Sequence, residues 1–222
     1  MRRQRFTMTL RQQLTAAACT AALLLTGCAG DNRLSSGTAD PVVTGSVNPQ
    51  PSIRATAEAA NAWREKPQSV RRAVTYARLL DAGGNKAAVI KVLETTLTHN
   101  PDDAKLVAYL GKELVLSGRP DAGIKQLNKA IAAGENNWKV YSALGSAYDQ
   151  SGKHSQARAA YQRALVEQPK KVSIHNNIGM SYILEGNLTQ AEAALRAAQK
   201  LPEGEFNQTL RQNLALSVGL QG

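Results

Sequence analysis

The chain has 222 residues, of which 43% are hydrophobic and 5% aromatic, and its formal net charge is +10. This length suits one domain or two small ones and is sufficient to bury a core. No apolar run approaches the roughly 20 residues of a membrane-spanning helix. With two cysteines, the composition excludes a disulfide scaffold, a collagen-like fibre and a polytopic membrane protein. The positive charge is not accompanied by a nucleic-acid-binding motif.

Residues 1–27 have the order of a secretory signal. Residues 1–13 are basic, residues 14–25 form an apolar run, and small residues lead to Cys28. Charged, apolar and small-residue regions in this order predict a signal peptide that is removed. The alternative, a short buried helix, leaves the four arginines before the apolar run unexplained.

The end of this segment, Leu25-Thr26-Gly27-Cys28, resembles the lipobox of bacterial lipoproteins. The resemblance implies that the Cys28 thiol receives a diacylglyceryl group and that, after cleavage, its amino group receives a third acyl chain. Several chains give stable membrane anchoring where one does not. Ala29 stands where the family's inner-membrane retention signal has Asp. The implied location is the outer membrane of a Gram-negative bacterium, on its periplasmic side.

Residues 28–51 follow as a Ser-, Gly- and Pro-rich stretch with few apolar residues. Such a composition cannot bury enough surface to offset the entropy of ordering, so we expect a flexible tether behind the lipidated cysteine. Cys19 lies in the predicted signal peptide. The mature chain is therefore expected to have no free thiol.

A repeat of 34 residues dominates the remainder. Gly84, Gly118, Gly152 and Gly186 are each 34 residues apart. The same step relates further residues: Gly111, Gly145 and Gly179; Leu93, Leu127, Tyr161 and Leu195; Ala130, Ala164 and Ala198. Apolar residues recur at helical spacing on both sides of each glycine of the first set, which predicts a helix ending at a left-handed glycine and a second helix after it. Such hairpins must stack to bury their faces.

These repeats resemble tetratricopeptide repeats, and residues 138–171 match that pattern best. The resemblance implies an all-α fold, a tetratricopeptide-repeat solenoid of stacked antiparallel helix pairs. The predicted parts are a half-repeat helix (52–69), four units (70–103, 104–137, 138–171 and 172–205) and a capping helix (206–222).

The sequence offers little for catalysis. Its histidines are scattered: His99 lies at a predicted helix end, His154 follows a boundary glycine and is expected to be exposed, and His175 takes the place of a packing aromatic. They make no ligand set. We expect no enzymatic activity, no metal and no cofactor.

In this repeat family the first helix of each unit lines a concave groove that holds peptides or partner helices. The matching positions are Arg71, Arg78, Lys105, Lys112, Lys139, Ser142, Ser146, Asn176, Asn177 and Met180. Asn177 stands at the family's backbone-binding asparagine position, while Ser146 and Met180 replace the second asparagine of its carboxylate clamp. The basic half is predicted to capture an acidic segment. The alternative is that these cations merely solvate helix faces.

Three motifs point to a narrower group. Residues 62–67 (AWREKP), 76–80 (YARLL) and 213–216 (NLAL), together with the lipobox and tether, resemble the tetratricopeptide-repeat lipoproteins of tight-adherence (Tad or Flp) pilus systems, the TadD family. The resemblance implies a scaffold that assembles or localises the pilus secretion apparatus, with a secretin or other pilus components as partners. The alternative is an adaptor that recruits peptidoglycan hydrolases or synthases on the same architecture.

Overall fold

The structure is a computed structural model that describes residues 51–221. The predicted signal peptide, Cys28 and nearly all of the tether lie outside the described residues. No helix within the described range combines the length and the apolar character needed to cross a membrane.

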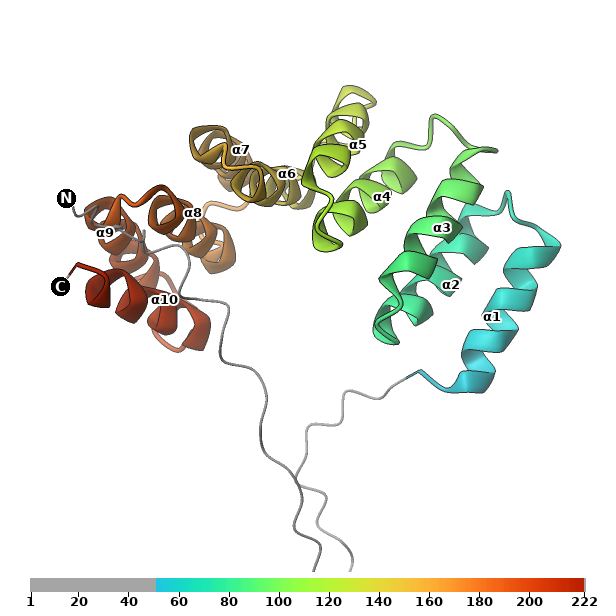
Figure 1. Cartoon of the computed structure of the whole chain (residues 1–222), viewed down its shortest axis with the longest axis horizontal. Helices are drawn as coiled ribbons and strands as arrows, with labels where there is room; N and C mark the ends of the chain where they lie inside the picture. Colours follow the sequence, from blue (N-terminus) through green and yellow to red (C-terminus); the bar gives the residue numbers. More distant parts are fainter. Residues whose placement is uncertain (1–50, 222) are drawn as a thin grey trace, which may run out of the picture. The chain divides into compact units, whose positions relative to one another are not determined.

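Residues 51–221 form helices and no strand (Figure 1). The helices, in chain order, are α1 (Ile53–Glu65), α2 (Val70–Ala82), α3 (Lys86–Leu97), α4 (Ala104–Leu116), α5 (Pro120–Ala132), α6 (Trp138–Gln150), α7 (His154–Glu167), α8 (Val172–Glu185), α9 (Leu188–Gln199) and α10 (Gln208–Gly219). The all-α stack of helix pairs predicted from the repeat is confirmed. The pairs α2/α3, α4/α5, α6/α7 and α8/α9 lie within the four predicted units, between α1 and α10.

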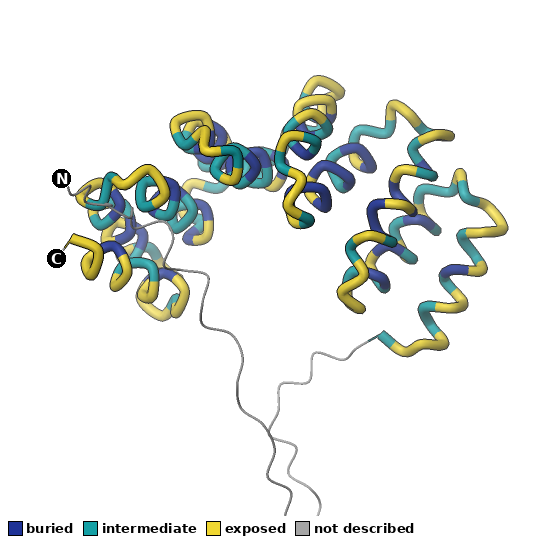
Figure 2. Tube along the Cα trace, viewed as in Figure 1, coloured by how far each residue is buried: buried dark blue, intermediate teal, exposed yellow. Residues whose placement is uncertain are grey.

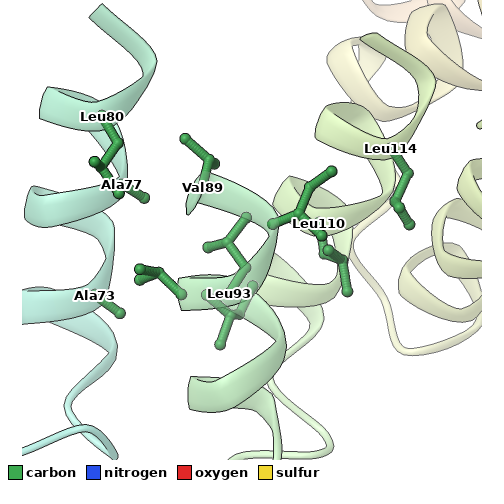
Figure 3. Packing of buried hydrophobic residues seen from close by; sticks show 10 residues of the cluster. Ala73, Ala77, Leu80, Val89, Leu93, Leu110 and Leu114 are labelled. Atoms are coloured by element: carbon green, nitrogen blue, oxygen red, sulfur yellow. The ribbon is translucent and has the colours of Figure 1, made fainter. Parts of the chain in front are cut away.

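Each helix packs on its neighbours in the chain, and first helices of successive pairs also touch, α4 with α6 and α6 with α8. Buried residues follow this path as a series of clusters (Figure 2). In the first cluster, Ala73 and Ala77 of α2 lie beside Leu93 of α3, and Leu110 of α4 continues the packing (Figure 3). The core therefore runs along the stack, and each pair is stabilised by the next.

The glycines at the ends of the first helices have the left-handed backbone that the repeat predicts. Gly84, Gly118, Gly152 and Gly186 have φ values of +76°, +71°, +71° and +84°. A side chain is strained in this conformation, whereas glycine adopts it freely. These residues therefore turn the chain tightly from the first helix of each pair into the second.

A different set of glycines sets the distance within pairs. A Cβ added to Gly145 of α6 would lie 2.4 Å from Tyr161 Cε1 of α7, and one added to Gly179 of α8 would lie 2.5 Å from Leu195 Cδ2 of α9. Real Cβ atoms are never this close to other atoms. The large residue 16 positions later thus fills the space that each glycine leaves, which explains why both recur at the same step.

Candidate functional site

A hollow of about 460 Å³ crosses the first helices of three successive pairs. We call it the central hollow. Its lining comes from α4, α6 and α8: Lys112, Val115, Leu116, Trp138, Lys139, Ser142, Ala143, Ser146 and Asn177. Because α4 touches α6 and α6 touches α8, residues up to 65 positions apart meet in one site.

The apolar part of the central hollow comes from the ends of two helices. Leu116 is the last residue of α4 and is 55% exposed, which is unusual for a large aliphatic side chain. Trp138 is the first residue of α6, and its backbone N–H donates to Glu167 Oε2 at 2.8 Å. Asn137 caps the same helix by accepting from the Val140 backbone N–H at 3.3 Å. These contacts hold the backbone at the start of α6, and the Trp138 side chain lines the hollow.

Two lysines give this apolar surface a positive charge. Lys112 and Lys139 are exposed, and neither forms an ion pair with any residue that the structure describes. The Lys139 Nζ lies 5.6 Å from the Trp138 ring centroid, within range of a cation–π interaction. No acidic residue lines the hollow. The site therefore combines two lysines that form no ion pair among the described residues with exposed apolar surface.

The structure brings together half of the predicted groove residues. Lys112, Lys139, Ser142, Ser146 and Asn177 line the central hollow. The others lie outside it: Arg71 and Arg78 are exposed on α2, Lys105 is exposed at the start of α4, and Asn176 and Met180 are half-buried on α8. The Asn176 Oδ1 accepts a hydrogen bond from Asn213 Nδ2 of α10 at 2.9 Å. That amide is therefore already engaged within the chain.

Sequence reasoning missed the apolar lining, which is formed by Val115, Leu116, Trp138 and Ala143. One signal could have found part of it. Leu116 occupies a repeat position that is exposed in every unit. In the next unit this position holds the polar residue Gln150. A large apolar residue at a solvent-facing repeat position is a candidate contact residue rather than a core residue.

The buried polar groups near the α6–α8 junction make a structural cluster. His154 Nδ1 lies 3.0 Å from Asp149 Oδ1, and the Tyr161 hydroxyl donates to Asp149 Oδ2 at 3.0 Å. The expectation that His154 is exposed was wrong: its side chain is 17% exposed, because the turn at Gly152 folds it back onto Asp149. Ser181 Oγ donates to the Asp149 carboxylate at 2.7 Å.

This cluster holds Ser, His and Asp without the order of a hydrolytic triad. A nucleophilic serine must donate to the imidazole, which is in turn oriented by the carboxylate. Here Ser181 donates to Asp149 instead and is fully buried. Among residues 51–221, no group of three or more His, Cys, Asp or Glu side chains is placed to hold a metal ion.

The same repeat positions carry an ionic cluster 68 residues earlier, where Asp81, Lys86 and Glu113 replace Asp149, His154 and Ser181. Lys86 Nζ lies 3.0 Å from Glu113 Oε2 and also pairs with Asp81. Glu113 is 1% exposed. Burial lowers the pKa of Lys86, but hydrogen bonds to Asp81 and Glu113 and their negative charges outweigh this and raise it above its ordinary value. A buried carboxylate is tolerated here because this cation faces it.

The pKa of Tyr161 predicts a loss of stability in alkali. Burial, the negative charge of Asp149 and the hydrogen bond to that carboxylate all raise the pKa of Tyr161 above 10.0. The unfolded chain releases this proton near pH 10 while the folded chain keeps it, so the free energy of unfolding falls as pH rises past about 10. Tyr161→Phe is expected to cost about 1 kcal/mol at neutral pH and to flatten the alkaline decline. Urea unfolding from pH 7 to 11 measures both; an unchanged decline in the variant would contradict the assignment.

Comparisons with known proteins agree with this architecture. Residues 142–206 match the tetratricopeptide repeat family. A search of curated proteins finds no match to the sequence. Among solved structures, the chain is similar to MamA AMB-1, with a TM-score of 0.61 and 25% identity over 68% of this chain and 89% of that one.

Two further solved structures share the fold at lower identity. YrrB, described as a TPR protein with an unusual peptide-binding site, has a TM-score of 0.58 and 18% identity over 75% of this chain and 85% of its own. PilW, described as a widely conserved type IV pilus biogenesis factor, has a TM-score of 0.66 and 20% identity over 75% of this chain and 78% of its own. The described part of the chain therefore has the fold of a tetratricopeptide-repeat solenoid, and residues 142–206 match that repeat family directly.

Proposed function

We propose that this protein is a non-enzymatic scaffold whose central hollow captures an acidic, partly apolar segment of a protein partner. The observation that carries the proposal is that one hollow combines Lys112 and Lys139, both free of ion pairs among the described residues, with the exposed Leu116 and the half-buried Trp138. An apolar side chain of the partner would contact Leu116 and Trp138, and its carboxylates would face the lysines. Electrostatic attraction of this kind accelerates encounter and selects partners by charge.

The proposed setting is the periplasmic face of the outer membrane, with the chain anchored through lipid on Cys28. The support is the lipobox-like Leu25-Thr26-Gly27-Cys28 at the end of the apolar run. Mass spectrometry of the mature amino-terminal peptide tests it. We expect a peptide that begins at Cys28 and carries three acyl chains; an unmodified peptide, or one that begins elsewhere, would contradict the anchoring.

The proposed process is assembly or localisation of a Tad/Flp pilus secretion apparatus. Three motifs (62–67, 76–80 and 213–216) resemble TadD proteins, and a pilus biogenesis factor, PilW, is built on the same fold. The second candidate is an adaptor for peptidoglycan hydrolases or synthases. It rests on the fold alone, which supports many partners. The two differ in the partner that is captured.

Charge reversal in the central hollow tests the scaffold function. A strain carrying Lys112→Glu and Lys139→Glu is expected to show about tenfold fewer surface pili, because two attractive ion pairs of up to about 1 kcal/mol each become repulsive. Sheared pilin quantified by immunoblot measures this. Lys125→Glu with Arg163→Glu is the matched control, since it makes the same charge change at exposed positions of α5 and α7.

The control strain is expected to keep wild-type piliation. Equal piliation in both variant strains and in the wild type, with normal cell separation in all three, would contradict capture through the central hollow. Normal pili combined with a cell-separation defect in the hollow variant would instead favour the peptidoglycan adaptor.

A further inference from the structure

The connection between α9 and α10 places acidic and apolar side chains in solvent. It spans residues 200–207 and is the longest connection between helices in the described part of the chain. Glu203 and Glu205 are exposed, and Phe206 is 82% exposed. Neither carboxylate forms an ion pair with a residue that the structure describes. We call residues 203–206 the acidic loop.

The exposure of Phe206 belongs to its repeat position. Phe206 lies directly before Asn207, the residue that caps α10. The residues directly before the caps of α2, α4, α6 and α8 are all polar and all exposed, although a second helix follows each of those helices: Gln68, Asp102, Asn136 and Lys170. An aromatic residue at a position that is exposed in every unit is a candidate contact residue.

A buried glycine holds the acidic loop in place. Gly204 packs against the end of α9, where an added Cβ would overlap the carbonyl oxygen of Ala198. Its backbone N–H donates to the Leu201 carbonyl at 2.8 Å, and its own carbonyl accepts from the Asn207 N–H at 3.2 Å. The backbone is therefore fixed while the side chains around Gly204 stay exposed. A segment fixed in this way loses less conformational freedom on binding than a flexible one.

Other exposed apolar side chains lack such free carboxylates beside them. Next to Val166, the Glu167 carboxylate accepts a hydrogen bond from the backbone at the start of α6. Next to Leu184, the Glu185 carboxylate pairs with Arg158 at 3.0 Å. The remaining large exposed apolar residues in the described part of the chain have no acidic neighbour in the sequence. The acidic loop is thus where residues 51–221 best match what the central hollow is proposed to capture.

We infer that the acidic loop of a second copy of this chain occupies the central hollow. This inference rests on the proposed function of the hollow and names a segment that it captures. Phe206 contacts the apolar lining, and Glu203 and Glu205 face the two lysines. The occupant comes from a second copy because the loop complements the hollow in charge, yet none of its residues lines the hollow of its own chain. The interface joins two different surfaces, so its repetition builds a filament or a closed ring.

Sedimentation velocity over a concentration series tests the inference on the full chain carrying Cys28→Ser, which removes the proposed lipid. We expect this parent to form larger species as its concentration rises. Glu203→Lys with Glu205→Lys reverses the charge of the loop, and Phe206→Ala removes its apolar contact. Each change is expected to raise the dissociation constant at least about tenfold. All three residues are exposed, so the core is left intact.

Charge exchange gives the decisive result. Lys112→Glu with Lys139→Glu is expected to weaken association as the loop reversal does. A chain with both reversals has a basic loop and an acidic hollow, so we expect it to associate again. An equimolar mixture of the loop-reversed and hollow-reversed chains is also expected to associate, because every loop then finds a hollow of opposite charge.

Glu94→Lys with Asp102→Lys is the matched control for the loop reversal. It makes the same charge change at exposed positions outside the loop and the hollow, and it should associate like the parent. A parent that stays monomeric at every concentration would overturn the inference. Association that survives the loop reversal, or a chain with both reversals that fails to associate, would overturn it as well.

These outcomes are separate from the test of the proposed function. A monomeric parent leaves in place the capture of an acidic segment from another protein. Normal pili and normal cell separation in the strain carrying Lys112→Glu and Lys139→Glu would contradict that capture, even if purified copies associate through the acidic loop.

Discussion

Lys86→Met is expected to lower the free energy of unfolding by about 3–5 kcal/mol, the usual cost of leaving a buried charge without its partner. Glu113 is 1% exposed, and its carboxylate lies 3.0 Å from Lys86 Nζ. Removing the cation leaves Glu113 and Asp81 as two carboxylates around one partly buried position. Urea unfolding followed by far-ultraviolet circular dichroism measures the loss.

The next interface of the stack supplies the control. There the corresponding positions hold Val115, Pro120 and Ala147, an apolar set without charge. Lys86→Met combined with Glu113→Ala is therefore expected to recover most of the lost stability, because no buried charge remains unpaired. A double variant as unstable as Lys86→Met alone would show that the lysine stabilises this junction through something other than Glu113.

Tyr161→Ala is expected to cost about 3–5 kcal/mol. Tyr161 is the largest fully buried side chain among the described residues and fills the space beside Gly145. Its loss leaves a cavity between α6 and α7 and removes the hydroxyl that donates to Asp149. The measurement is the same denaturant unfolding, with the cavity confirmed by a crystal structure of the variant.

Tyr161→Leu is the matched variant, because Leu127 and Leu195 occupy this repeat position opposite Gly111 and Gly179. It keeps an apolar side chain in the space and loses mainly the hydrogen bond, so we expect a cost of about 1–2 kcal/mol. Equal losses for the alanine and leucine variants would mean that the hydroxyl, and not the packing beside Gly145, dominates at this site.

The fold could be predicted from the sequence because its signals are local and repeated. Gly118 and Gly152 have positive φ at the ends of their helices, where the 34-residue step places them. Once one helix pair is recognised, the same step predicts the positions of the helices in the next pair. The stack departs from that step once, at α10, which lies 36 residues after α8. Loop length is weakly specified by sequence, since extra surface residues cost little. The register of α10 therefore needed the structure.

The candidate site could be predicted only in part. The polar side of the groove follows from the repeat frame, which places Lys112, Lys139 and Asn177 on first helices. The apolar side does not, because Leu116 and Trp138 are apolar residues of the kind that fill cores. Only the structure shows that Leu116 is exposed and that Trp138, which packs partly against a core cluster, also lines the hollow. The burial of His154 could not be predicted either. Its partner, Asp149, is only five residues away in the sequence, but the two side chains meet because the chain turns back at the left-handed Gly152.

If the central hollow formed by α4, α6 and α8 captures a pilus-assembly partner as we propose, that partner lies beside Ser142 in the cell. A photo-crosslinking amino acid placed at Ser142, inside the central hollow, tests it directly, with the same group at Arg163 on α7 as the control position. We expect a secretin or another pilus component to be crosslinked from position 142 and not from position 163. We expect this product to be lost when Lys112 and Lys139 are changed to Glu. Crosslinks to peptidoglycan enzymes, or identical products from both positions, would contradict it.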